Sequence, residues 1–110
     1  MIPGVEVMIG DKKYTIPPLS LGQLRNGVME KLRVHDQLIT DGKGYEATVA
    51  KGEIILAALS RNYPKLTLDE LELDFGNVNS LWLATLGLAG FNPSGEAPAT
   101  GEKTPSESGT

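Results

Sequence analysis

"LSRNYPKLTLDELELDFGN", residues 59–77, decides how this chain folds, because it ends one long helix and turns the chain toward another. Pro64 pushes the residue before it out of the α region, so the preceding helix is expected to end near Tyr63. Thr67 and Glu70 then have the spacing of a capping box, in which each side chain accepts a hydrogen bond from the other residue's backbone N–H. The chain is therefore expected to restart in a new direction at this box.

Two helices are predicted after the box. The first is short and covers residues 67–73, and Gly76 ends it. Asn77 or Asn79 is then the predicted N-cap of a last helix over residues 77–90. That last segment is apolar on nearly all sides, which is typical of a helix buried from several directions.

Three elements are predicted upstream. Residues 5–16 alternate apolar and polar side chains around a Gly-Asp turn, which predicts a β-hairpin. Ser20 is the predicted N-cap of an amphipathic helix over residues 20–39. A second amphipathic helix is predicted over residues 45–63, and Gly52 on its apolar stripe would let another helix approach closely.

The predicted fold is mainly α, in the α+β class: an N-terminal β-hairpin followed by a small bundle of three to four helices. One folded domain is expected over residues 1–91. Residues 92–110 form a polar tail without a large apolar residue. Such a tail cannot bury enough surface to offset its ordering entropy, so it is expected to be disordered.

The composition excludes several classes of function. The chain has no Cys, which rules out disulfides and thiolate metal sites, and its only His leaves a His-based zinc site short of ligands. A net charge of −4 argues against a nucleic-acid binder. No apolar run is long enough to span a bilayer, and the N-terminus lacks the charged flank of a signal peptide. A soluble protein of a reducing compartment, with no cofactor, no metal and no membrane contact, is expected.

The residues with catalytic or metal-binding side chains have simpler interpretations. His35 is the only ready general base, but it lies on the apolar stripe of the first helix and is interpreted as a packed residue. The densest charge cluster contains Asp69, Glu70, Glu72 and Asp74. It lacks the ligand spacing of a calcium loop, so a capped, solvated helix face is favoured over a cation site. No phosphate-binding glycine motif is present. The sequence thus predicts no enzyme and no catalytic residue.

A two-stranded hairpin is marginal by itself, and the last helix is apolar on nearly all sides. Both elements are therefore candidates for a surface that binds a partner. Trp82 on the last helix has two interpretations of equal weight. It either fills the core between the two long helices, or it anchors a partner protein, as Trp often does at interfaces.

Three strings carry a family resemblance: "YTIPPLSLGQL" (residues 14–24), "LSRNYPKLTLDEL" (residues 59–71) and "NVNSLWLATLGLAGF" (residues 77–91), followed by a polar tail. Their order resembles the tail assembly chaperones of long-tailed bacteriophages, particularly those of Mu-like phages. The resemblance covers roughly residues 5–91 and contains no catalytic residue.

The resemblance implies a non-enzymatic chaperone that binds the helical tape measure protein, keeps it soluble and helps to recruit tail tube subunits. It implies action in the host bacterial cytoplasm and absence from the mature virion. A partner helix lying in a groove would be held by apolar anchors. The residues predicted for that role are Leu81, Trp82, Leu86 and Phe91.

Two alternatives stay open. The chain could be a structural virion component, such as a small tail or head–tail connector subunit, whose hairpin pairs between neighbouring copies. A small regulatory or enzyme-accessory domain that depends on His35 is less favoured. The sequence also leaves a homo-oligomer open.

Overall fold

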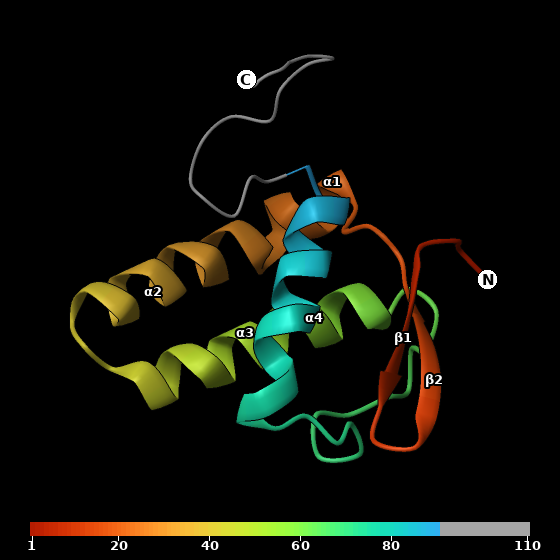
Figure 1. The fold of residues 1–110 in the computed structure, drawn as a ribbon. Helices are drawn as coiled ribbons and strands as arrows, with labels where there is room; N and C mark the ends of the chain where they lie inside the picture. Colours follow the sequence, from red (N-terminus) through yellow and green to blue (C-terminus); the bar gives the residue numbers. More distant parts are fainter. Residues whose placement is uncertain (91–110) are drawn as a thin grey trace, which may run out of the picture.

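The structure is a computed structural model that describes residues 1–90. Its elements follow the order hairpin, bent helix, long helix, final helix (Figure 1): β1 (Val5–Ile9), β2 (Lys12–Ile16), α1 (Leu21–Gln23), η1 (Leu24–Val28), α2 (Met29–Thr40), α3 (Gly44–Leu59) and α4 (Phe75–Leu88). The predicted fold class, a hairpin followed by helices, is confirmed. The tail predicted over residues 92–110 lies outside the described residues.

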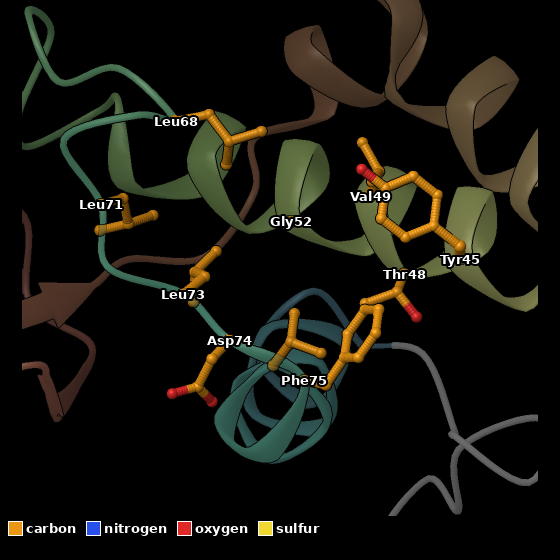
Figure 2. A pocket seen from close by; sticks show the side chains of 10 residues that line it. Tyr45, Thr48, Val49, Gly52, Leu68, Leu71, Leu73, Asp74 and Phe75 are labelled. Atoms are coloured by element: carbon orange, nitrogen blue, oxygen red, sulfur yellow. The ribbon is translucent and has the colours of Figure 1, made fainter.

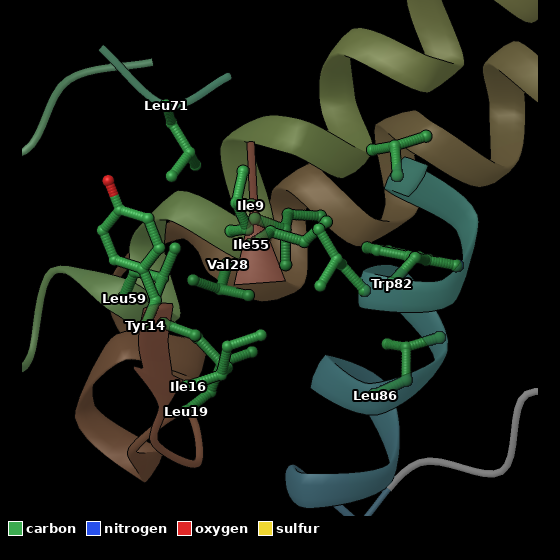
Figure 3. Packing of buried hydrophobic residues seen from close by; sticks show 14 residues of the cluster. Ile9, Tyr14, Ile16, Leu19, Val28, Ile55, Leu59, Leu71, Trp82 and Leu86 are labelled. Carbon is green, nitrogen blue, oxygen red and sulfur yellow. The ribbon is translucent and has the colours of Figure 1, made fainter. Parts of the chain in front are cut away.

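The hairpin forms as its alternating pattern predicts. β1 and β2 pair antiparallel, with Val7 opposite Tyr14 and Met8 opposite Lys13. Successive side chains of a strand point to opposite faces, so one face carries Ile9, Tyr14 and Ile16, all of which are buried. That inner face packs against α3, and it contributes its apolar side chains to the core shown in Figure 3.

The first predicted helix, residues 20–39, is broken in the structure. Ser20 is its N-cap as predicted: the backbone N–H of Gln23 donates to Ser20 Oγ (3.0 Å), and the N–H of Ser20 donates to Gln23 Oε1 (3.0 Å). The run then kinks in η1, a wide turn where Gly27 adopts φ 145° and ψ −27°. That backbone conformation is open to Gly because it has no Cβ. The kink separates α1 from α2, which continues to Thr40.

α3 occupies the centre of the fold, beside α2 and α4 and next to the hairpin (Figure 1). It buries Ile54, Ile55, Ala58 and Leu59. Its end at Leu59 comes four residues before the predicted end at Tyr63. The carbonyl of Leu59 accepts hydrogen bonds from the N–H groups of both Asn62 (2.9 Å) and Tyr63 (2.8 Å), which closes the helix with a turn.

Residues 67–73 do not form the predicted helix. The capping box itself is present: Thr67 N–H donates to Glu70 Oε1 (3.0 Å), and Glu70 N–H donates to Thr67 Oγ1 (3.3 Å). After this single turn the chain leaves the helical path: Leu73 N–H donates to the carbonyl of Leu71 (2.7 Å), and Leu71 and Leu73 both point inward while Glu72 stays exposed. Residues two apart lie on different faces of a helix, so a regular helix would not turn both leucines inward. Burial of Leu71 and partial burial of Leu73 override the local helix signal.

α4 begins at Phe75, two residues before the predicted start, and its N-cap is Asp74 rather than Asn77 or Asn79. The N–H of Asn77 donates to Asp74 Oδ1 (2.9 Å), and the N–H of Asp74 donates to Asn77 Oδ1 (3.0 Å). Asn77 therefore serves as the third residue of a capping box. A carboxylate at this end also interacts favourably with the helix dipole.

The hairpin is fastened to the end of α3 by Asn62 and Tyr63. The Asn62 side chain accepts a hydrogen bond from Ile2 N–H (2.7 Å), and its Nδ2 donates to the carbonyls of Ile2 (2.9 Å) and Thr15 (3.2 Å). The N–H of Thr15 donates to Tyr63 Oη (3.0 Å), and the Tyr63 ring meets Tyr14 edge to face at 5.3 Å. One side-chain pair thus holds the N-terminus, β2 and the end of α3 together.

Replacing Asn62 with Ala removes three hydrogen bonds at once. We expect Asn62→Ala to lower the free energy of unfolding by about 1–3 kcal/mol, because partly buried backbone groups lose their partner. Chemical denaturation measures the change. Asn79→Ala is the matched control; Asn79 is exposed and receives only a long bond from Lys51 (3.3 Å), so its loss should stay within about 0.5 kcal/mol. Equal effects of the two substitutions would contradict the anchoring role of Asn62.

Candidate functional site

Three of the four predicted binding residues lie in the core. Leu81, Trp82 and Leu86 are only 5%, 6% and 8% exposed. Figure 3 shows Trp82 and Leu86 pointing from α4 into the apolar cluster. These side chains are therefore not available at the surface of this chain, and their role as partner contacts stays a prediction. Phe91 lies outside the described residues.

Trp82 fills the space where α4 meets the two other long helices. Its ring packs against His35 of α2, with ring centroids 4.9 Å apart, and Lys51 Nζ of α3 lies 6.0 Å from the ring centroid. Of the two interpretations of Trp82, the structure supports the one that places it in the core.

His35 is also a packed residue, as the sequence predicts. It is 7% exposed, and its Nδ1 lies 3.0 Å from Asp36 Oδ1. Its Nε2 is buried and has no hydrogen-bond partner among the described residues. His35 thus contributes mainly a flat ring against Trp82, and no nucleophile lies within hydrogen-bond distance of it.

Two substitutions distinguish the contribution of ring packing from that of hydrogen bonding at the His35–Trp82 contact. We expect His35→Phe to keep the free energy of unfolding or to raise it by up to about 1 kcal/mol, because Phe keeps the ring and removes an unsatisfied buried nitrogen. Trp82→Ala should lower it by about 3–5 kcal/mol through the cavity it leaves. Thermal and urea unfolding measure both. A loss above about 1 kcal/mol in His35→Phe would show that the ring nitrogens of His35 make a stabilising hydrogen bond, through Nδ1 to Asp36 or through Nε2.

The structure reveals a different candidate site, an apolar groove of about 360 Å³ between α3, α4 and the 66–74 segment (Figure 2). We call it the α3–α4 groove. It is lined by ten residues: Tyr45, Thr48, Val49, Gly52, Leu68, Leu71, Leu73, Asp74, Phe75 and Val78. Most of this lining is aliphatic or aromatic, which is typical of sites that bind apolar groups.

Two aromatic side chains stand at one end of the groove and are largely exposed. Tyr45, in the first turn of α3, is 68% exposed, and Phe75, the first residue of α4, is 66% exposed. Their rings meet edge to face with centroids 6.2 Å apart, and Figure 2 shows both side chains beside the groove. A pair of exposed aromatic rings next to an apolar hollow is the feature of this surface that most favours contact with a partner.

Gly52 lies within the lining of the groove, but it does not receive a packed helix as the sequence suggested. A Cβ at Gly52 would lie 3.5 Å from Leu68 Cδ1 and 3.5 Å from Leu73 Cδ1, which is ordinary van der Waals distance. The neighbour of Gly52 is therefore the 66–74 segment. The absence of a side chain at this position adds depth to the groove.

The 66–74 segment, which forms one wall of the groove, is rich in acidic residues. Asp74 is the one charged residue in the lining, and Asp69, Glu70 and Glu72 are exposed along the same segment. No Lys or Arg occurs between residues 66 and 75. Glu72 lies beside Gly10 of the hairpin turn and Glu70 is bonded to Thr67, so Asp74 is the member of the predicted charge cluster that lines the groove. No group of three or more possible metal ligands occurs in residues 1–90.

Two polar side chains of the groove make hydrogen bonds in the first turns of α3 and α4. Thr48 Oγ1 donates to the carbonyl of Gly44 (2.9 Å), and the Asp74 carboxylate caps α4. No base and nucleophile face each other in this lining.

Sequence reasoning missed both Tyr45 and Phe75 as surface residues. Tyr45 was counted in the apolar stripe of its helix, and Phe75 fell between two predicted helices. One signal was available: each aromatic residue adjoins an acid, Glu46 or Asp74, at the start of a helix, where the first turn often faces solvent.

Comparison with known proteins finds no matching family model, no matching curated protein and no matching solved structure. Among the described residues, no helix has both the length and the apolar character needed to cross a membrane.

Proposed function

We propose that this protein is a non-enzymatic tail assembly chaperone that binds the tape measure protein of a long-tailed phage, keeps it soluble and helps to recruit tail tube subunits. The observation that carries the proposal is the α3–α4 groove with Tyr45 and Phe75 exposed beside it. A chaperone of this kind needs apolar surface that is free in the absence of its client. The resemblance of three sequence strings to phage tail assembly chaperones supplies the identity of the client.

The residues that line the groove indicate which kind of client segment would bind there. An apolar lining takes large aliphatic or aromatic side chains from one face of an amphipathic helix. Asp74 in the lining favours Lys or Arg beside those side chains, through charge complementarity. The client segment is therefore a basic amphipathic helix, and the net charge of −4 helps to keep the chaperone itself soluble.

The proposed contact residues lie at the start of α3 and at the start of α4, not on the buried face of α4. Phe75 and Tyr45 replace Leu81, Trp82 and Leu86 as the apolar anchors. Since both aromatic side chains are mostly exposed, their truncation removes contact area for a client without opening a cavity in the core.

The test is co-expression with the tape measure protein, followed by measurement of affinity for its helical segment. We expect Phe75→Ala and Tyr45→Ala together to weaken binding by about 2 kcal/mol or more, roughly thirtyfold in Kd, because aromatic anchors dominate such interfaces. The free energy of unfolding should change little.

Leu21→Ala is the matched control, since Leu21 is 85% exposed and lies on α1 outside the groove lining. This variant should bind as the wild type does. Unchanged affinity in the Tyr45 and Phe75 variant would exclude the groove as the client site. Failure of the wild-type protein to bind any tape measure segment would exclude the proposed function.

A structural virion component remains the second candidate function, and the solvent-facing residues of β1 favour it, since an open strand can pair with a neighbour. Mass spectrometry of purified mature particles separates the two. The chaperone is expected to be absent from them, whereas a tail or connector subunit would be present in fixed stoichiometry.

A further inference from the structure

The two edges of the hairpin differ. At the outer edge of β2, Thr15 donates its N–H to Tyr63 Oη and its carbonyl accepts from Asn62 Nδ2. The backbone groups of Thr15 therefore point away from β1 and are already satisfied. This edge is closed by the side chains that follow α3.

The register then fixes which groups of β1 face outward. In an antiparallel pair, residues alternate between those that bond across the pair and those that point away from it. Glu6 lies opposite Thr15, and Met8 lies opposite Lys13. Since Thr15 points outward on β2, Glu6 and Met8 point outward on β1. No backbone hydrogen bond joins either residue to a described residue outside the hairpin.

This edge has few of the usual protections against strand pairing. Met8 is 58% exposed, and β1 contains neither Pro nor Lys. The one charge on the strand, Glu6, is partly neutralised by Lys13 of β2, whose Nζ lies 3.5 Å from Glu6 Oε1. The edge therefore offers two N–H groups and two carbonyls to another strand.

We propose that a second copy of this chain pairs with β1 in antiparallel orientation, across a twofold axis that passes beside Val7, to form a four-stranded sheet. Glu6 then lies opposite Met8 of the second copy, and Met8 lies opposite Glu6 of the second copy. Both outward N–H groups and both outward carbonyls of each strand are satisfied by this one register.

The neighbouring registers are less favourable. An axis at Glu6 places two like charges directly opposite each other, which is destabilising. An axis at Met8 places Glu6 opposite Gly10 of the second copy. Gly10 lies in the hairpin turn with φ 64°, so it does not offer Glu6 a partner within a strand. The Val7 register avoids both the facing like charges and the pairing with a turn residue. It brings the two Val7 side chains together on the inner face, so the helices of both copies lie on the same side of the sheet.

This inference does not depend on the client groove, and cysteine cross-linking of the full chain tests it. Two Val7 residues facing each other across the axis form a non-hydrogen-bonded pair, with Cα atoms about 4.5 Å apart, within the span of a disulfide. The chain has no Cys of its own, so each variant carries one thiol. Val7→Cys should form a disulfide-linked dimer under mild oxidation at least tenfold faster than Val5→Cys, its control on the same face of β1. In this register Val5 lies opposite Ile9 of the second copy.

Analytical ultracentrifugation supplies the second measurement. The wild type should show a concentration-dependent rise in mass toward twice 11.7 kDa. Met8→Pro should abolish the rise: it removes only an outward N–H and leaves the ladder between β1 and β2 intact. Met8→Ala keeps that N–H, so this variant should still show the rise in mass. A wild type that stays monomeric at all concentrations would overturn the proposal. So would a dimer that survives Met8→Pro, or faster cross-linking at Val5 than at Val7.

Discussion

The attachment of the hairpin to the end of α3 through Asn62 and Tyr63 is the constraint on which the rest of the structure depends. These two residues satisfy the outer edge of β2 and hold the N-terminus, so the inner face of the hairpin is pressed against α3. A two-stranded hairpin is marginal by itself, and this attachment gives it a surface on which to bury Ile9 and Ile16. It also leaves β1, rather than β2, as the open edge of the sheet.

The same attachment determines the path of the 66–74 segment and thereby the groove. After Tyr63 the chain turns back across α3, with Leu71 buried and Leu73 close to Gly52. Its acidic residues stay exposed. Asp74 then starts α4 at an angle that buries Trp82 and leaves Phe75 beside Tyr45. The proposed client site is thus the space that remains where a short non-helical segment covers α3.

Local signals in the sequence predicted much of this arrangement. The alternation of the hairpin, the Ser20 cap and the Thr67–Glu70 box are each encoded within a few residues, and each is present. Two predicted helices failed for different reasons. The 67–73 helix is replaced by a non-helical path because Leu71 and Leu73 both meet the core, which is formed by residues distant in sequence. The 20–39 helix is interrupted by the local kink at Gly27, despite its regular apolar spacing. The groove could not be predicted, since it is formed by residues from three separate segments.

Hydrogen exchange of the full chain, with and without the tape measure protein, tests the central claim most directly. The account predicts that binding slows exchange of backbone amides in residues 45–52 and 66–78, which line the groove, and leaves the hairpin amides of residues 12–16 unchanged. Slowed exchange confined to other parts of the chain, with the groove segments unaffected, would contradict the assignment of the α3–α4 groove as the client site.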